Sequence, residues 1–276
     1  MFFVAPPIFG GRGTSLINEI KNEGLESGLK LCLDAGDINS WPGSGQLWKD
    51  LSGNGNHFYL GGGSGADGAD PTFNGTPGGL SQNEYFSVAG GDYFTLAQAN
   101  PQWVKDLFRV GSASFFVMLR IPTDANLHIF ATEDGTTTHY GGSMKYASDF
   151  GKSEGFVFVN SGGSSGYGVL GVGIDAPTFP GLYGLAIATT IASNGDWQVA
   201  GSVNDSSGGP PGPPSAGTVP DTHDPTQTAK IFANGNASQT AASGARIYCL
   251  AVWQGVAIDP DASAHMFSMM RNRFGL

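Results

Sequence analysis

The sequence predicts an all-β protein, a jelly-roll β-sandwich with an extended N-terminal arm and a short C-terminal helix. Glycine accounts for 44 of 276 residues, twice the usual ~7%, and glycines at this density mark many turns. Hydrophobic residues make up 40% of the chain and charged residues 13%, so the chain can bury a large core. At least ten short apolar segments separated by glycine-rich breaks predict many short strands.

Residues 1–27 differ in composition from the rest and are predicted to form an arm followed by a short helix. The arm contains Pro6-Pro7 and no periodic pattern, yet it is too apolar for a solvated tail. We therefore expect it to dock against its own domain or a neighbouring protein. The expected docking residues are Phe2, Phe3, Val4, Ile8 and Phe9. Residues 28–276 are expected to form the jelly-roll domain.

The helix after the arm is predicted from apolar residues at helical spacing. Thr14 or Ser15 is its expected N-cap, and Gly24 is expected to end it. The residues that share its apolar face are Leu16, Ile17, Ile20 and Leu25.

The first strand is predicted at residues 28–34, where three leucines alternate with other residues and so share one face. Two further apolar segments, 84–88 and 92–96, flank Gly90-Gly91. Glycines between two such segments are typical of a hairpin turn, so these strands are expected to pair with each other.

Residues 99–108 predict a short helix. The continuous apolar run at 112–121 ends at Pro122 and predicts a strand buried on both faces. Residues 205–220 contain too many prolines and glycines for a strand ladder and are expected to form an exposed loop. Further strands are expected at 127–132, 155–160, 166–174, 183–192, 196–203, 230–234 and 245–253.

The clearest helix is predicted at the C-terminal end, over residues 259–276. Asp259 can cap it, and Pro260 suits the first helical position. The side chains expected to face inward are Met266, Phe267, Met270 and Phe274.

Three motifs near the start of the chain carry a resemblance to a known family. They are GLKLCLDAGD at 28–37, SWPGSGQLWKDLSGNGNHF at 40–58 and NEYFSVAGGDYFTL at 83–96. In this order they resemble the laminin-G-like, concanavalin A-type jelly rolls of phage and bacterial surface proteins, and residues 244–275 match that family's last strand and closing helix. The matching segments cover roughly a third of the chain. The resemblance implies the fold and leaves function open, because this fold hosts lectins, enzymes and passive virion modules.

The SGNGN segment at 52–56 is best explained as a structural turn. Its serine and asparagine side chains can bond neighbouring backbone groups, and its glycines tolerate positive φ. An alternative is a calcium site, because hard oxygen ligands suit Ca²⁺. The candidate ligands are Asp34, Asp37, Asp50 and Asn54.

Several functional classes are excluded by composition and by missing motifs. The net charge is −10 and basic residues are scattered singly, so nucleic acid and anionic membranes are not expected partners. No apolar run approaches the length of ~18 residues that a membrane span needs. Related glucanases carry an ExDxE carboxylate set on one strand, and this chain has no such set, no GxSxG elbow and no HExxH motif. We therefore expect no enzymatic activity.

The form of these motifs looks like that of phage virion proteins, which implies a structural role in a phage particle. The expected protein decorates or cements the capsid, or belongs to the tail, and docks through its arm onto major capsid proteins, tail proteins or further copies of itself. The first residues lack the pattern of a signal peptide. This agrees with assembly in the host cytoplasm and a final location in the virion.

A second hypothesis is a lectin-like module that binds host glycans. Sugar platforms use exposed aromatic rings beside polar side chains. The candidates are Trp41, Tyr140, Tyr167 and Trp197, for each of which core packing is the alternative.

The two cysteines, Cys32 and Cys249, fall in the first and last predicted strands. The resemblance implies that these strands run side by side in one sheet. A protein made in a reducing cytoplasm keeps its thiols free. We therefore expect two buried, reduced cysteines on neighbouring strands.

Overall fold

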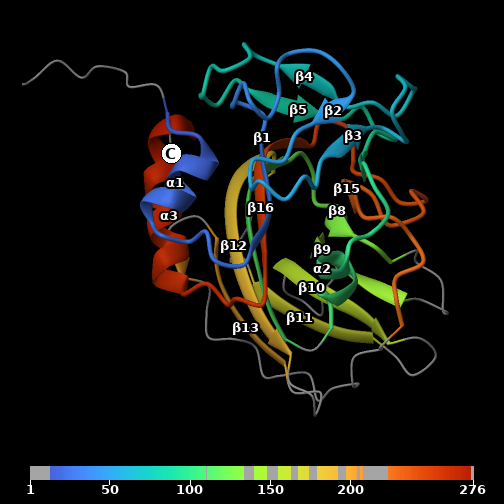
Figure 1. The fold of residues 1–276 in the computed structure, drawn as a ribbon, viewed down its shortest axis with the longest axis vertical. Coiled ribbons are helices and arrows are strands. Elements are labelled where there is room, and N and C mark those ends of the chain that lie inside the picture. Colours follow the sequence, from blue (N-terminus) through green and yellow to red (C-terminus); the bar gives the residue numbers. More distant parts are fainter. Residues whose placement is uncertain are drawn as a thin grey trace, which may run out of the picture.

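The computed structural model describes residues 13–109, 111–133, 140–147, 155–162, 167–173, 179–191, 197–203, 206–207 and 223–274. In these residues two antiparallel sheets face each other, as the jelly-roll prediction requires (Figure 1). Sheet A contains β1 (Leu29–Asp34), β4 (Thr72–Asn74), β5 (Tyr85–Ser87), β7 (Gly111–Ile121), β12 (Gly181–Ile191), β13 (Trp197–Val203), β14 (Ser206–Ser207) and β16 (Arg246–Gln254). Sheet B contains β2 (Leu47–Trp48), β3 (Phe58–Leu60), β6 (Phe94–Leu96), β8 (Leu127–Ala131), β9 (Tyr140–Ala147), β10 (Gly155–Gly162), β11 (Tyr167–Gly173) and β15 (Lys230–Ile231).

The order of the strands places the ends of the chain beside each other. Sheet A runs β14-β13-β12-β7-β16-β5-β4, with β1 also paired to β16. Sheet B runs β11-β10-β9-β8-β15-β6-β3-β2. The first and last strands therefore lie side by side, as the resemblance implied.

The main hydrophobic core lies between the two sheets. Alternate residues of strands such as β3, β6 and β7 face inward, and large aromatic rings fill the space between the sheets. The largest fully buried side chains of this layer are Trp48, Phe58, Phe86, Phe94, Phe115, Phe130 and Tyr146. The short helix α2 (Gln102–Asp106), within the predicted 99–108, adds Trp103 and Val104 to the same core.

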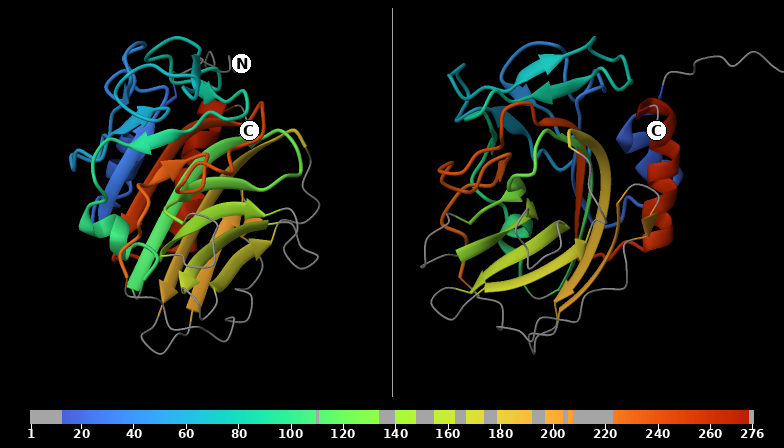
Figure 2. Two further views of the ribbon diagram at one scale, coloured as in Figure 1. Left: turned by 90° about the vertical axis from the view of Figure 1, so that its right-hand side faces the viewer. Right: turned by 180° about the vertical axis from the view of Figure 1, so that it is seen from behind.

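Two helices cover the outer face of sheet A and bury a second hydrophobic cluster. Figures 1 and 2 show α1 (Leu16–Asn22) and α3 (Pro260–Phe274) next to each other on this face. All four residues predicted to face inward from the C-terminal helix are buried here, and so are Leu16, Ile17 and Ile20. The helix predictions are therefore confirmed, except that α1 ends before Leu25, which is only partly buried. None of the helices among the described residues is long and apolar enough to cross a membrane.

The cysteine prediction is confirmed, with a detail that alternation alone did not give. Cys32 pairs with Ala251, and Asp34 pairs with Cys249, so the thiols sit two positions apart on adjacent strands. Both thiols are free and buried. Burial raises the pKa of Cys32 well above its usual value, and nearby Asp34 adds to the rise, so the thiol stays protonated.

Two β-bulges change the expected faces of these strands. The register shifts between Leu29 and Leu31, so Leu29 faces the helices while Leu31 and Leu33 face the main core. A second shift, on β16 opposite β7, turns Ile247 toward the main core and Cys249 toward the helices. An extra residue reverses the side-chain alternation at each bulge. The expected single apolar face of residues 28–34 was therefore wrong for Leu29.

The predicted hairpin around Gly90-Gly91 is also wrong. β5 belongs to sheet A, whereas β6 belongs to sheet B, so this connection links the two sheets. Phe86 and Phe94 point at each other across the core, with ring centroids 5.2 Å apart in an edge-to-face arrangement. The two strands therefore pack face to face and do not pair edge to edge.

Two predicted segments lie outside the described residues. They are the docking arm at residues 1–12 and nearly all of the loop at 205–220.

Candidate functional site

The SGNGN turn is held by a single carboxylate. Asp50 Oδ1 accepts hydrogen bonds from the backbone N–H groups of Cys32 and Ser52, both at 2.9 Å. Its Oδ2 accepts from the Ser52 hydroxyl at 2.7 Å and from the Asn56 backbone N–H at 3.0 Å. All four donors belong to the turn or to the strand beneath it, so Asp50 fastens the turn to β1.

The same turn satisfies the carbonyl group that the bulge in β1 leaves without a partner in the ladder. Lys30 has no opposite residue in the β1–β16 register. Its carbonyl oxygen instead accepts hydrogen bonds from the Ser52 hydroxyl at 3.1 Å and from the Asn56 side-chain amide at 2.6 Å. The Asn54 amide bonds the adjacent Leu29 carbonyl at 2.9 Å. The turn is therefore structural, as predicted.

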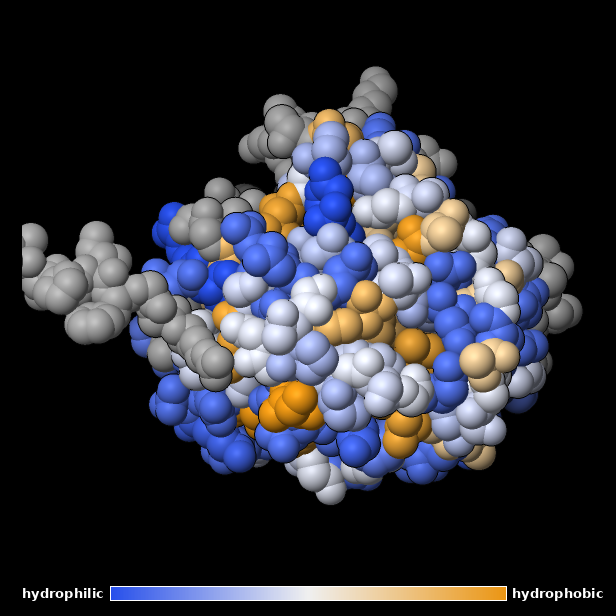
Figure 3. Space-filling view, turned by 90° about the horizontal axis from the view of Figure 1, so that it is seen from above, coloured by the Kyte–Doolittle hydropathy of each residue, from blue (hydrophilic) through white to orange (hydrophobic). Residues whose placement is uncertain are grey.

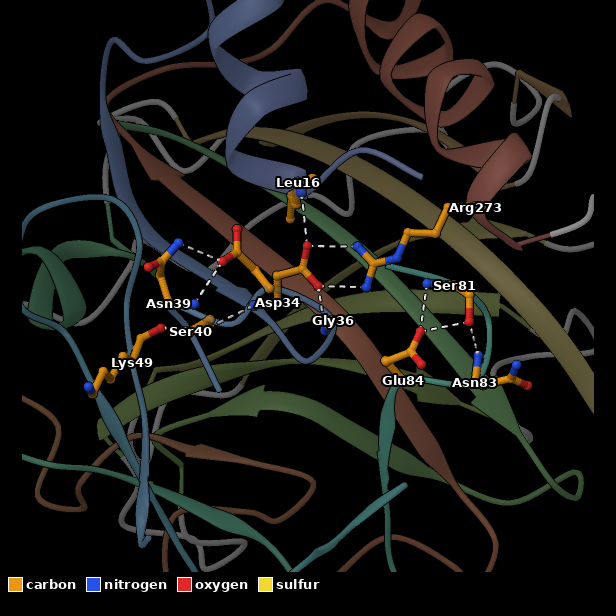
Figure 4. A network of polar contacts seen from close by, with 11 residues as sticks. Leu16, Asp34, Gly36, Asn39, Ser40, Lys49, Ser81, Asn83, Glu84 and Arg273 are labelled. Carbon is orange, nitrogen blue, oxygen red and sulfur yellow. Dashed lines mark hydrogen bonds and ion pairs between the residues drawn. The ribbon is translucent and has the colours of Figure 1, made fainter. Parts of the chain in front are cut away.

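Asp34 forms a buried ion pair with Arg273 of α3 (Figure 4). The Arg273 guanidinium donates two hydrogen bonds to the two carboxylate oxygens, at 2.7 and 2.6 Å, and both side chains are 0% exposed. Burial opposes the charged form of Arg273, but the Asp34 carboxylate outweighs it and raises the pKa of the guanidinium. A Cβ at position 36 would collide with the guanidinium, so Gly36 is what permits this approach.

The Asp34 carboxylate also caps the first helix. It accepts hydrogen bonds from the backbone N–H groups of Leu16 and Gly36, each at 2.9 Å. Ser15 occupies the N-cap position, as predicted, but its side chain makes no capping bond. The pair therefore ties α1, β1 and α3 together at the point where the described chain begins.

The four candidate calcium ligands do not gather into one site. The Asp34 carboxylate is taken by Arg273 and the Asp50 carboxylate by the turn, as described above. Asp37 accepts from its own loop, through the Asn39 backbone N–H at 2.8 Å, and Asn54 donates to carbonyls. Within the described ranges, no group of three or more His, Cys, Asp or Glu side chains is placed to hold a metal ion.

The predicted sugar-binding aromatics also do not form one platform. Trp41 is only 3% exposed and packs edge-on against Phe86 in the core, so it offers no free face to a sugar. Tyr140 and Tyr167 belong to strands of sheet B, whereas Trp197 belongs to sheet A. The side chains of these three residues lie outside the described part of the structure.

A different set of residues occupies the outer face of sheet B, the face opposite the helices. Tyr59 pairs with Thr95, and Thr95 pairs with Lys230, so the three form a row across β3, β6 and β15. Their neighbours in sequence face the main core, which turns this row outward. Tyr93 precedes β6 on the same face, and the Lys230 ammonium lies 5.8 Å from the centre of its ring. The two tyrosines are partly exposed.

Polar groups of the loop at 61–70 border this row. The Gln46 side-chain amide donates to Asp70 Oδ2 at 2.9 Å, and Asp67 Oδ2 accepts from the Gly62 backbone N–H at 3.0 Å. A Cβ at Gly61 would collide with both carboxylates, so they lie directly against its backbone.

The Tyr93 phenol lies close to this border. Burial raises its pKa, and the nearby Asp67 carboxylate raises it further. We call Gln46, Tyr59, Asp67, Asp70, Tyr93, Thr95 and Lys230 the sheet B platform.

The platform has features that suit the binding of a polar ligand with apolar faces. Its two tyrosines are partly exposed, and so are most of its polar side chains, while Asp67 is exposed. The Thr95 hydroxyl donates to the Gly61 carbonyl at 2.8 Å. The face viewed in Figure 3 carries hydrophobic residues as separate spots, and Ile38 is the one large hydrophobic residue counted as exposed among the described residues. The sequence pattern indicates that Tyr59 and Tyr93 face outward, because the Phe and Leu residues that alternate with them fill the core.

Farther along sheet B, His128 is buried beneath the loop that carries Gln239. Its Nε2 lies 3.1 Å from Gln239 Oε1, and its Nδ1 lies 3.4 Å from Glu133 Oε1. Burial lowers the pKa of His128, and nearby Lys145 lowers it further, while Glu133 and Gln239 act in the opposite direction. The imidazole is therefore held as part of the fold, only 4% exposed.

We expect His128→Gln to weaken the pH dependence of stability on the acid side. As the pH falls through 6.5, the ordinary pKa, the unfolded imidazole binds a proton before the buried one does. The unfolded state is then favoured, and stability falls by at most about 1.4 kcal/mol per pH unit until the lowered folded pKa is passed. Urea unfolding of both proteins between about pH 7.5 and about pH 5 measures this. Equal slopes for the two proteins would contradict the expectation.

Comparisons with known proteins support the fold. A scan against protein-family models finds no match, and a search of the curated proteins finds none. Among solved structures, the binding domain of botulinum neurotoxin DC in complex with SialylT has a TM-score of 0.58 at 12% identity, covering 89% of this chain and 52% of that chain. Trypanosoma rangeli sialidase in complex with sialic acid has a TM-score of 0.52 at 10% identity, covering 91% of this chain and 37% of that chain.

A third similar structure, described as a receptor binding domain, gives a TM-score of 0.51 at 11% identity, covering 93% of this chain and 53% of that chain. The chain thus spans about half or less of the length of these proteins. At such identities the likeness shows the β-sandwich fold and nothing finer. The resemblance to phage virion proteins stays a prediction, because none of these proteins bears on it.

Proposed function

We propose that this protein is a non-catalytic recognition module that binds carbohydrate on the sheet B platform. The observation that carries the proposal is the row of Tyr59, Thr95 and Lys230, with Tyr93 beside it, on the face that the helices leave uncovered. Of the similar structures, one is a complex with SialylT, another is a complex with sialic acid, and a third is a receptor binding domain. Recognition of a surface glycan is the function that these features share.

The chemistry of the platform suits a sugar. The C–H face of a sugar ring packs on an aromatic face, and a buried aromatic contact contributes about 0.5–1.5 kcal/mol beyond the area it covers. Sugar hydroxyls can donate to acceptors and accept from donors at the same site. Gln46 Oε1 and Asp70 Oδ1 are buried and have no hydrogen-bond partner among the described residues, so they lie beneath the surface that a sugar would contact. The Asp67 side chain is exposed and is the acceptor of the border that a ligand can reach. Rings supply contact area while the polar groups supply orientation.

The arrangement does not resemble that of a glycosidase. Such an enzyme needs one carboxyl group that donates a proton and a second that attacks or activates water. The two platform carboxylates instead accept N–H donors of the protein. Asp67 accepts from Gly62 and Ala69 of its own loop, and Asp70 accepts from Asp67 and from the Gln46 side chain. We therefore extend the expectation of no enzymatic activity to this site.

Binding to a glycan array, followed by titration of each hit, tests the proposal. Tyr93→Ala and Tyr59→Ala should each weaken binding about tenfold, the equivalent of about 1.4 kcal/mol. Tyr85→Ala is the matched control, because Tyr85 is also partly buried but lies on sheet A against Tyr248. The control should bind like the wild type. Absence of any saturable binding, or equal loss in all three variants, would contradict the proposal.

A structural role in a phage virion is the second candidate. The resemblance of the motifs supports it, and the predicted docking arm lies outside the described residues. The Gly13 backbone N–H donates to the Leu80 carbonyl at 3.1 Å, and the Asp34–Arg273 pair fixes α1 just after it. The arm at residues 1–12 is thus joined to a firmly held point. If the protein binds no glycan and removal of residues 1–12 abolishes its attachment to particles, this candidate replaces the first.

A further inference from the structure

The charges around the sheet B platform are unevenly distributed. Asp67 and Asp70 both lie on its border, against the backbone of Gly61. Lys230 is the cation within the row, and its ammonium lies over the Tyr93 ring. The whole chain carries a net charge of −10, so the field beyond the platform is also negative. An anionic ligand would approach against both the local and the overall charge.

The residue best suited to hold a carboxylate is missing from this sheet. Arginine binds carboxylates through two parallel hydrogen bonds, and this geometry recurs wherever a carboxylate must be recognised. The eight strands of sheet B contain no arginine. Among the described residues, Arg120 and Arg246 belong to sheet A, Arg271 and Arg273 to α3, and Arg109 follows α2.

Lys230, the cation of the row, is poorly placed to replace arginine. The other lysine on a strand of sheet B is Lys145 of β9, which pairs with His128 of β8. Lys230 is partly buried, and burial lowers its pKa, so its charge is less favourable there than in water. Its position over the Tyr93 ring is an interaction that a ligand carboxylate would have to disturb. Lys49, which follows β2, is exposed, and a solvated ammonium adds little to binding.

We infer that the platform selects neutral glycans and disfavours sialylated ones, an inference that rests on the proposed function. The acceptor-rich border suits sugar hydroxyls, each of which can donate a hydrogen bond. A sialic acid carboxylate placed near Asp67 or Asp70 meets repulsion and finds no arginine. The inferred preference therefore differs from the ligands with which two of the similar structures are described, SialylT and sialic acid.

Titration calorimetry with lactose and with 3′-sialyllactose, and with longer glycan pairs that differ only in terminal sialic acid, tests this. The neutral member should bind at least about tenfold more tightly at low salt. The ratio of the two dissociation constants should fall toward one as salt screens the repulsion. Asp67→Asn should also lower this ratio of dissociation constants, because it removes one negative charge from the border. Asp37→Asn is the matched charge control, since it also removes one negative charge but lies in an exposed turn off sheet B.

The outcomes separate this inference from the proposed function. Tighter or equal binding of the sialylated members overturns the inference and leaves carbohydrate recognition standing. A preference for neutral members that Asp67→Asn does not alter also overturns it, because the border charge is then not its cause. Failure of every neutral and sialylated glycan to bind overturns the proposed function and the inference together.

Discussion

Replacement of Arg273 by methionine is expected to lower the free energy of unfolding by about 3–5 kcal/mol, the usual cost of breaking a buried ion pair from one side. The variant leaves the Asp34 carboxylate fully buried without its charge partner. That carboxylate also caps α1 through Leu16 and holds the Gly36 backbone, so its disturbance reaches both helices. Chemical denaturation followed by fluorescence and circular dichroism measures the change.

Two further variants identify the cause of that loss. Arg109→Met breaks partly exposed ion pairs with Asp106 and with Asp224, whose side chain is 54% exposed, and should cost about 1 kcal/mol or less. The double variant Asp34→Leu, Arg273→Met removes both charges and should recover part of the stability lost by the single variant. A loss at Arg273 no larger than that at Arg109 would show that the buried pair does not hold the helices.

The parts of the fold that depend on local patterns could be predicted from the sequence. The closing helix follows from apolar residues at helical spacing after Asp259-Pro260, and its four inward residues are buried as expected. The pairing of the strands that carry Cys32 and Cys249 followed from the resemblance, and the structure confirms it. In each case a short segment contained enough information to fix its own conformation or its place in the family pattern.

The parts that depend on distant partners could not be predicted. Phe86 and Phe94 follow the same alternation that a hairpin would show, and only the three-dimensional fold decides that their strands enter different sheets. Asp34 looked like a calcium ligand because its partner, Arg273, is 239 positions away. Tyr59 and Tyr93 are not among the predicted sugar-binding residues, although their alternation with core residues directs them outward.

Replacement of Asp50 by alanine is the second substitution expected to have a large effect. It removes the acceptor of four hydrogen bonds and leaves the backbone N–H groups of Cys32 and Asn56 buried without partners. Each unpaired buried donor costs about 1–3 kcal/mol, so the free energy of unfolding should fall by about 3 kcal/mol or more. Thermal and urea unfolding measure the loss.

The effect of Asp50→Ala should spread to β1, because the turn it holds also satisfies the Lys30 carbonyl at the bulge. Hydrogen exchange of the Cys32 amide, which donates to Asp50, should therefore become faster. Asp37→Ala is the matched control, since Asp37 accepts its side-chain bonds from the nearby Asn39 in an exposed turn. It should cost less than about 1 kcal/mol, the range of surface substitutions. Similar losses in the two variants would mean that the SGNGN turn is not fastened by Asp50, and its polar side chains would then need another explanation.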